Sequence, residues 1–287
     1  MSSRSVPKIR YRRKGRTLYS RVRHIARAVR HDEYRSVPIV MFTAYFDASG
    51  NKRSPVLTMA GFVSRVSKWD RFEREWLALL KSYGVSSLHM TEFVSAKGQF
   101  EGWKGDSARR KRFIDDAVAC VKRNTNKGVA TSVYISEYNE INAKFRLAEK
   151  AGTPYTMCGM MAIAMVRDWA LKKGVDPKQV LYMVEDGDED QGELIERSNQ
   201  DGYKVIRLTK ADSQAFQAGD MAAWKAMAAL REAERKTKLR ENQKLTVDDL
   251  ESIIRSLDPI APIVLKNGVI SIDRLRLMCA DHRIAPR

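Results

Sequence analysis

Alternating and continuous apolar runs along the chain mark the expected strands. Residues 41–47 (MFTAYFD) alternate and are rich in aromatic side chains, and residues 56–64 (VLTMAGFVS) follow after a turn rich in Gly, Asn, Ser and Pro. The two segments therefore predict a β-hairpin. The near-continuous apolar run 180–185 is typical of an internal strand, and further strands are expected at 129–135 and 203–208.

Apolar residues at helical spacing predict the helices between and around these strands. The long ones are expected at residues 67–83, 107–122, 155–173, 190–201 and 214–235. Strands and helices mixed in this order indicate an α/β domain with a mixed sheet over residues 41–235. Residues 1–40 are expected to form an N-terminal arm with a helix at 17–31. Residues 236–287 are expected to form a C-terminal extension, with a helix near 247–256 and a strand near 262–266.

Composition narrows the class of protein. The 287 residues are 44% hydrophobic and 30% charged, which is ordinary for a soluble globular chain large enough to bury a core. The three cysteines form no CxxC pair, which argues against a zinc site and favours a reduced, cytoplasmic compartment. The basic start lacks the apolar segment of a secretory signal. The longest near-apolar run, residues 157–166, is too short to span a bilayer, so no membrane association is expected.

The net charge of +17 is concentrated at one end of the chain. Residues 1–40 hold 12 Lys or Arg and 2 Asp or Glu, which is +10 of that total. Polyanions are the natural partner of such an arm, and DNA or RNA is favoured over an acidic membrane surface. A solvated tail and a helix that binds an acidic protein are the alternatives. The candidate nucleic-acid-binding residues are Arg10, Arg12, Arg13, Lys14, Arg16, Arg21, Arg23 and Arg27.

Two carboxylates stand at the ends of predicted strands. Asp47 ends the first strand on the face of Thr43 and Tyr45, although an Asp before Ser-Gly also suits a turn. Glu185 ends the apolar strand 180–185, and ligands commonly bind at the carboxyl ends of strands in α/β sheets. The acids that follow Glu185 also suit the N-terminus of the next helix, which is the expected role of Asp188 and Asp190.

Asp220 is the most informative carboxylate because of its position in a helix. It lies within the apolar stripe formed by Phe216, Ala223, Met227 and Leu230. Burying an unpaired carboxylate costs several kcal/mol, so Asp220 must be paired, protonated or bound to a metal. The alternative is a buried carboxylate that is hydrogen-bonded to the backbone or to Gln217.

Four short segments follow one another in order within residues 41–230: Tyr45–Gly50, His89–Glu92, Glu185–Asp188 and Gln217–Asp220. They resemble the motifs Y-x-D-E-S-G, H-x-x-E, E-D-G-D and Q-x-A-D of the domain of unknown function 3800 family, which is placed in the RNase H-like (retroviral integrase) superfamily. Two positions differ from the family pattern: Ala48 replaces a Glu, and Gly219 replaces an Ala, which we expect to let the helix approach the sheet closely.

The resemblance implies an RNase H-like fold and a site for Mg²⁺ or Mn²⁺ formed by Asp47, Glu92, Glu185 and Asp220. Asp186 is the alternative ligand to Glu185. Such a site activates water for phosphodiester hydrolysis. We therefore expect a nuclease acting on DNA or RNA, associated with phage, mobile elements or defence, or alternatively a non-cleaving binding module with a degenerate site. No GxSxG, Walker A or GxGxxG motif supports other enzyme classes.

Overall fold

The computed structural model describes residues 42–188 and 190–239, the short stretches 269–270 and 275–277, and residue 279. The N-terminal arm, the predicted helix near 247–256 and the predicted strand near 262–266 lie outside the described residues. In the part of the chain that is described, no helix is both long and apolar enough to cross a membrane.

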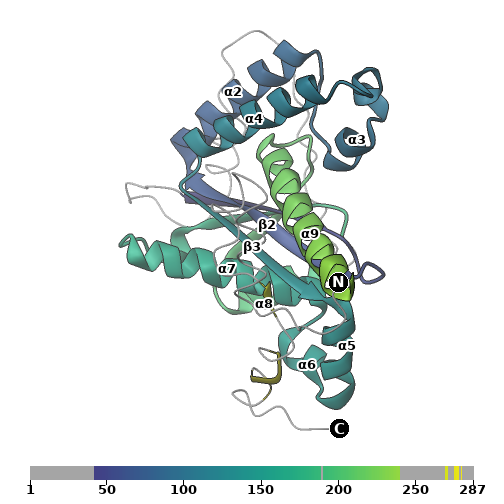
Figure 1. The fold of residues 1–287 in the computed structure, drawn as a ribbon. Helices are drawn as coiled ribbons and strands as arrows, with labels where there is room; N and C mark the ends of the chain where they lie inside the picture. Colours follow the sequence, from purple (N-terminus) through teal and green to yellow (C-terminus); the bar gives the residue numbers. More distant parts are fainter. Residues whose placement is uncertain (1–41, 189, 240–268, 271–274, 278, 280–287) are drawn as a thin grey trace, which may run out of the picture.

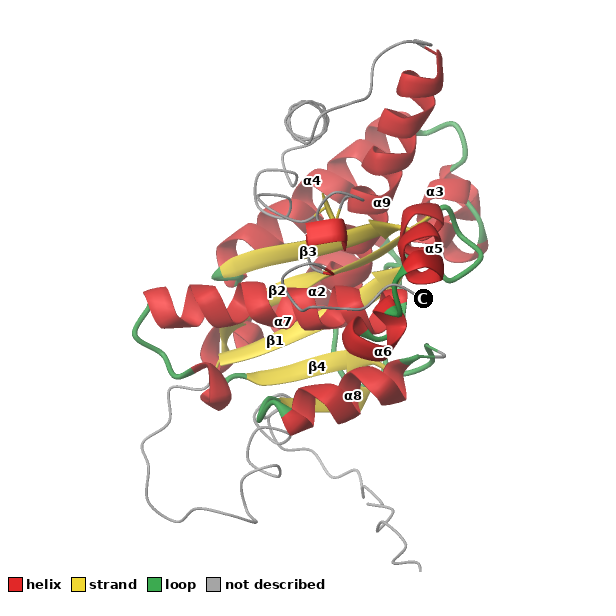
Figure 2. Ribbon diagram, turned by 90° about the horizontal axis from the view of Figure 1, so that it is seen from below, coloured by secondary structure: helices red, strands yellow, loops and turns green. Residues whose placement is uncertain are grey.

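A single mixed sheet forms the centre of the molecule, in the order β5-β4-β1-β2-β3-β6. Its strands are β1 (Phe42–Ser49), β2 (Val56–Arg65), β3 (Lys127–Tyr134), β4 (Leu181–Glu185), β5 (Lys204–Leu208) and the two-residue β6 (Val269–Ile270). Strand β2 runs antiparallel to both of its neighbours, β1 and β3, whereas β4 and β5 run parallel to β1 (Figure 2). The predicted hairpin and mixed sheet are confirmed, and the arrangement is compatible with an RNase H-like fold.

The five long helices of the sequence prediction are confirmed within a few residues. They are α2 (Val66–Tyr83), α4 (Ser107–Asn124), α7 (Pro154–Lys172), α8 (Gln191–Gln200) and α9 (Ala215–Leu239). The periodicity did not reveal several short elements. These are α3 (Met90–Ser95), α5 (Ile135–Lys144), α6 (Leu147–Ala151) and the 3-10 helices η1 (Gly98–Trp103) and η2 (Pro177–Gln179).

Helices cover both faces of the sheet, so the domain has three layers. Alternation along β1 distributes its side chains between the two faces, as predicted. Tyr45 packs into the cluster formed with α2, α4 and α9. Phe42, Ala44 and Phe46 pack into the cluster formed with α7 and α8. Figure 1 shows α9 and α7 on opposite sides of the sheet.

Two buried tryptophans of α2 fix this helix to β1 and α9. The Trp69 ring lies 5.0 Å from that of Tyr45, and its Nε1 donates to the Thr43 carbonyl oxygen at 2.9 Å. Trp76 Nε1 donates to Gln217 Oε1 of α9, also at 2.9 Å. A buried indole N–H requires such an acceptor, so the two hydrogen bonds define where α9 lies relative to β1.

Candidate functional site

The parallel strands place their carboxyl ends at one edge of the sheet. The register between β1 and β4 pairs Phe46 with Val184, so Asp47 and Glu185 come next on adjacent strands. On the other side of β4, Glu185 pairs with Leu208, the last residue of β5. The loop that follows β5, residues 209–214, therefore begins at the same edge as the two carboxylates.

Lys210 in this loop brings three carboxylates together. Its Nζ lies 3.1 Å from Glu185 Oε2, 3.4 Å from Asp47 Oδ2 and 4.0 Å from Asp220 Oδ2. The Lys210 side chain is 32% exposed and that of Asp47 only 4%. The structure thus gathers Asp47, Glu185 and Asp220 from β1, β4 and α9 around one ammonium group. We call these four residues the Lys210 cluster.

Asp220 is positioned by backbone groups of the segment that leads into α3. Its Oδ2 accepts a hydrogen bond from Met90 N at 3.0 Å. Gln217, one turn earlier on α9, accepts from Leu88 N at 2.7 Å through the same oxygen that binds Trp76. The sequence left the backbone and Gln217 as alternative hydrogen-bond partners of Asp220, and the structure shows the backbone partner. Gln217 instead holds the segment before α3 against α9.

Asp47 has one satisfied and one unsatisfied carboxylate oxygen. Its Oδ1 accepts from Ala48 N at 2.7 Å, whereas Oδ2 is buried and has no hydrogen-bond partner. The Lys210 ammonium provides a charge contact for Oδ2. A buried carboxylate oxygen without a hydrogen bond is costly, and a bound cation or a proton would lower that cost.

The proximity of these acids changes their proton affinity. Burial, followed by the neighbouring Glu185 carboxyl, raises the pKa of Asp47 well above its ordinary value, and Lys210 opposes this. Burial also raises the pKa of Asp220, although Lys210 and the Met90 hydrogen bond act in the other direction. Burial alone would lower the pKa of Lys210, but the charges of Asp47, Asp220 and Glu185 outweigh it and raise that pKa. The cluster is therefore electrostatically coupled.

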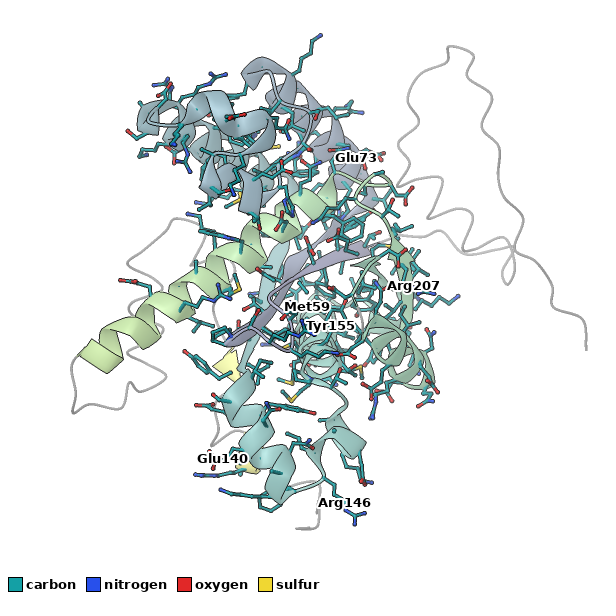
Figure 3. The ribbon with its side chains drawn as sticks, turned by 90° about the vertical axis from the view of Figure 1, so that its right-hand side faces the viewer. Met59, Glu73, Glu140, Arg146, Tyr155 and Arg207 are labelled. Atoms are coloured by element: carbon teal, nitrogen blue, oxygen red, sulfur yellow. The ribbon has the colours of Figure 1, made fainter. Side chains whose placement is uncertain are left out.

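A cavity of about 270 Å³ lies between the β1–β2 turn, the loop after β4 and the first turn of α7, and its lining residues are not those of the Lys210 cluster. Tyr155 lies at its wall and belongs to the same apolar cluster as Met59 of β2; both are labelled in Figure 3. Burial raises the pKa of Tyr155, and the nearby carboxylates of Asp188, Asp47 and Glu185 raise it further. Lys52 and Arg53 also line the cavity, so cations and carboxylates meet there.

The sequence did not identify every residue of this region. Lys210 was missed, although it closely follows a strand whose carboxyl end was expected at the site. Tyr155 was missed because it lies in an otherwise apolar helix. Asp188, expected only to cap a helix, is half-buried and shares a hydrogen bond with Tyr155. The Asp190 side chain makes no cap hydrogen bond to α8.

The remaining predicted ligands lie around the cluster. Among the described residues, the acids within 4.0 Å of the Lys210 nitrogen do not include Glu92 or Asp186. Glu92 is half-buried on α3, and a Cβ built on Gly98 would lie 3.1 Å from its Oε2. The Asp186 side chain is exposed, which favours Glu185 of the two alternatives. His89 immediately precedes α3, and its charge lowers the pKa of Asp220.

The donor set suits a hard divalent cation, but the geometry is not that of a formed metal site. Within the described segments, no group of three or more His, Cys, Asp or Glu side chains is arranged to hold a metal ion. The three oxygens lie 3.1–4.0 Å from the Lys210 nitrogen, whereas Mg²⁺ requires oxygen ligands at about 2.1 Å. Metal binding thus requires the carboxylates to move closer together and Lys210 to leave. The buried Oδ2 of Asp47, which has a charge contact with Lys210 but no hydrogen bond, fits such an ion.

The arrangement holds the Lys210 ammonium at the edge of the sheet. A scan against protein-family models finds no match for this chain, and searches of curated proteins and of solved structures find no match either.

Proposed function

We propose that this protein is a metal-dependent nuclease of RNase H-like fold, related to the domain of unknown function 3800 family, that hydrolyses phosphodiester bonds in DNA or RNA. The observation that carries this proposal is the meeting of Asp47, Glu185 and Asp220 at one edge of the sheet, with the Asp47 Oδ2 atom buried and without a hydrogen-bond partner.

The sheet supports the proposal because its strand directions create the site. Asp47 lies near the carboxyl end of β1, beside Glu185 at the end of the parallel strand β4, and α9, which packs on β1 and β2, carries Asp220. The order of motifs in the sequence thus corresponds to a convergence in space. Like charges repel and burial disfavours each charge, so three acids from three elements need a cation among them, and in this structure the Lys210 ammonium takes that place.

In this mechanism Asp47, Glu185 and Asp220 would hold Mg²⁺ or Mn²⁺. When bound, such an ion would supply a water of lowered pKa and would stabilise the leaving oxygen of the phosphodiester. Backbone N–H groups of Ala48 and Met90 orient the carboxylates of Asp47 and Asp220. Lys52 and Arg53 line the cavity and are suited to a phosphate group of the substrate. Glu92 remains a candidate fourth ligand that would need to turn from Gly98 toward the cluster.

The basic N-terminal residues support a nucleic-acid partner independently of the site. A net charge of +10 over residues 1–40 favours phosphate contacts that do not depend on base sequence. A protein that cleaves a polyanion with an acidic site needs positive charge elsewhere to bind its substrate. We assign that role to the arm.

Cleavage assays test the proposal. Labelled single- and double-stranded DNA and RNA are incubated with Mg²⁺, with Mn²⁺ or with EDTA. We expect cleavage only with metal, and a loss of at least about a hundredfold in Asp47→Asn and Asp220→Asn, since each removes a charged ligand. Asp115→Asn is the matched control, because Asp115 lies on α4 in an exposed pair with Lys111 at 2.6 Å.

A non-cleaving nucleic-acid-binding protein is the second candidate function. It is favoured by Ala48, which has no carboxylate where the related motif has one, and by the Lys210 ammonium among the acids. If the wild-type protein binds nucleic acid but leaves every substrate intact with either metal, this second function replaces the first. If Asp115→Asn loses activity as fully as Asp220→Asn, the loss does not report on the proposed site.

A further inference from the structure

Lys210 occupies the position that a cation would need in the carboxylate cluster. Its ammonium contacts acids from three different elements, and no other lysine among the described residues approaches all three. The contacts involve both a largely buried acid, Asp47, and a partly exposed one, Glu185. The side chain thus enters the cluster from its solvent-facing side.

Hydrogen bonds at both ends of its loop hold Lys210 in this place. Asp212 Oδ2 accepts from Thr209 N at 2.9 Å and from Thr209 Oγ1 at 2.7 Å, which closes a turn around Lys210. Ser213 Oγ donates to Glu73 Oε1 of α2 at 3.2 Å. The loop is therefore held by hydrogen bonds within itself and by one to the neighbouring helix α2. These bonds fix the loop backbone that carries Lys210, while the place of its ammonium also depends on the side-chain rotamer.

We propose that Lys210 is an internal competitor of the divalent cation: its ammonium and the metal use the same carboxylate oxygens, so the metal binds only when Lys210 moves away. This inference rests on the proposed metal-dependent function and adds a control on how the site is loaded. A metal at about 2.1 Å from these oxygens leaves no room for an ammonium at 3.1–4.0 Å, and the two positive charges repel each other.

The Lys210 side chain can move out of the carboxylate cluster. Lys210 is 32% exposed, so its four-carbon stem can rotate toward solvent without opening the core. Until it does, its charge stabilises acids that would otherwise repel one another. Lys210 therefore has two opposing effects: it stabilises the metal-free fold, and it weakens the affinity for metal by the free energy needed to displace it.

Replacing Lys210 separates these effects. Mn²⁺ binding is measured by electron paramagnetic resonance, and thermal unfolding is followed in EDTA and in Mn²⁺. In Lys210→Met we expect a lower melting temperature in EDTA, an Mn²⁺ affinity about tenfold higher than wild type, and a larger stabilisation by Mn²⁺. Lys210→Gln keeps a polar group among the acids and provides the same test if the methionine variant does not fold.

Lys172→Met is the matched control, since it also removes one positive charge. Lys172 is exposed at the last turn of α7, seventeen residues along the helix from Tyr155, which is about 25 Å. Its Mn²⁺ affinity should equal that of wild type. A similar gain in Lys172→Met would show a general effect of net charge and would overturn the inference.

The outcomes distinguish this inference from the proposed function. If Lys210→Met binds Mn²⁺ no more tightly than wild type, while Asp220→Asn abolishes binding in both backgrounds, the metal site stands and Lys210 is not its competitor. If neither wild type nor Lys210→Met binds Mn²⁺, yet Lys210→Met is destabilised in EDTA, the cluster is a structural ion-pair network and both proposals are overturned.

Discussion

Gly219 of α9 lies against Asp47 of β1. A Cβ atom built on Gly219 would be 3.1 Å from Asp47 Cβ and 3.4 Å from its backbone nitrogen. The close approach places the next helix residue, Asp220, beside the strand end that carries Asp47. The absence of a side chain at position 219 is therefore part of what brings these two carboxylates to the same ammonium group, and the expectation from sequence that this glycine permits close packing is confirmed.

Gly219→Ala should affect the site more than the fold. Alanine favours the helix by about 1 kcal/mol relative to glycine, but its Cβ contacts Asp47 at a distance that forces the helix or the carboxylate to move by a few tenths of an ångström. We expect a melting temperature close to wild type and Mn²⁺ affinity or cleavage reduced about three- to tenfold, because catalysis is sensitive to displacements of this kind.

Gly192→Ala is the control for this substitution. Gly192 lies in α8, and nothing is found within 4 Å of a Cβ built on it. This variant should gain stability without a change in metal affinity. If both glycine variants leave the site unaffected, the Gly219 contact is not what sets the position of Asp47.

Asp220→Asn should change how stability depends on pH in the absence of metal. The pKa of Asp220 is raised from its ordinary 3.8, so the folded state prefers the neutral carboxyl. The stability that comes from this preference is fully present below the pKa that Asp220 has in the unfolded chain. It is lost as the pH rises through the higher pKa that Asp220 has in the folded protein. Asparagine has no such proton and can still accept the hydrogen bond from Met90 N. Relative to wild type, Asp220→Asn should therefore become progressively more stable as the pH rises from 4 to 7.

Chemical denaturation in EDTA at several pH values measures this gain. The control, Asp115→Asn, alters an exposed ion pair, and its free energy of unfolding should depend on pH in the same way as that of wild type. A constant difference between Asp220→Asn and wild type from pH 4 to pH 7 would contradict the elevated pKa. Mg²⁺ should stabilise wild type more than Asp220→Asn at pH 7, since the metal takes the place of the proton.

Gln217→Met should destabilise the protein although methionine has nearly the same size. The Gln217 Oε1 atom accepts from both Trp76 Nε1 and Leu88 N, and all three residues are buried. Removing the acceptor leaves two buried donors unsatisfied, at about 1–3 kcal/mol each, so we expect the free energy of unfolding in urea to fall by about 2–4 kcal/mol. Gln200→Met, on the exposed end of α8, should change stability by less than about 0.5 kcal/mol.

The fold followed from sequence where periodicity was strong. The near-continuous apolar run that became β4 and the Trp-rich stripe that became α2 each specified an element, because burial on a defined face leaves a regular pattern. Helix α5 was not predicted because its ten residues bury only Ile135, Tyr138 and Ile141. Helix α3 is six residues long, too short for a period to be visible.

The site was predictable only in part, for a related reason. Asp220 could be found because a charge interrupts an apolar stripe, and Glu185 because it ends an internal strand. Nothing local distinguishes Lys210 from the many other lysines of a basic chain. Its role depends on the strand order, which brings the loop after β5 to the edge where β1 and β4 end. That information is a property of the assembled sheet and not of any sequence window.

The N-terminal arm provides the test that separates affinity from chemistry. It lies outside the described residues, so its predicted role depends on charge alone: +10 of the total +17 lies in residues 1–40, while every proposed metal ligand lies beyond residue 46. Removing one lysine or arginine that neutralises a phosphate should reduce the salt slope of log K by about 0.9 on duplex DNA, or about 0.7 on single strands.

Deleting residues 1–36 should weaken nucleic-acid binding and flatten its dependence on salt, because the deletion removes the groups that release counterions from phosphates. Mn²⁺ affinity should be unchanged, since the three carboxylates lie on β1, β4 and α9. Asp220→Ala is the complementary variant: it should abolish cleavage and retain or increase affinity, as a negative charge leaves the site. Filter binding at several salt concentrations measures affinity and slope, and the cleavage assay measures activity. If the deletion leaves affinity and slope unaltered, the arm does not anchor nucleic acid, and an acidic protein becomes its better partner.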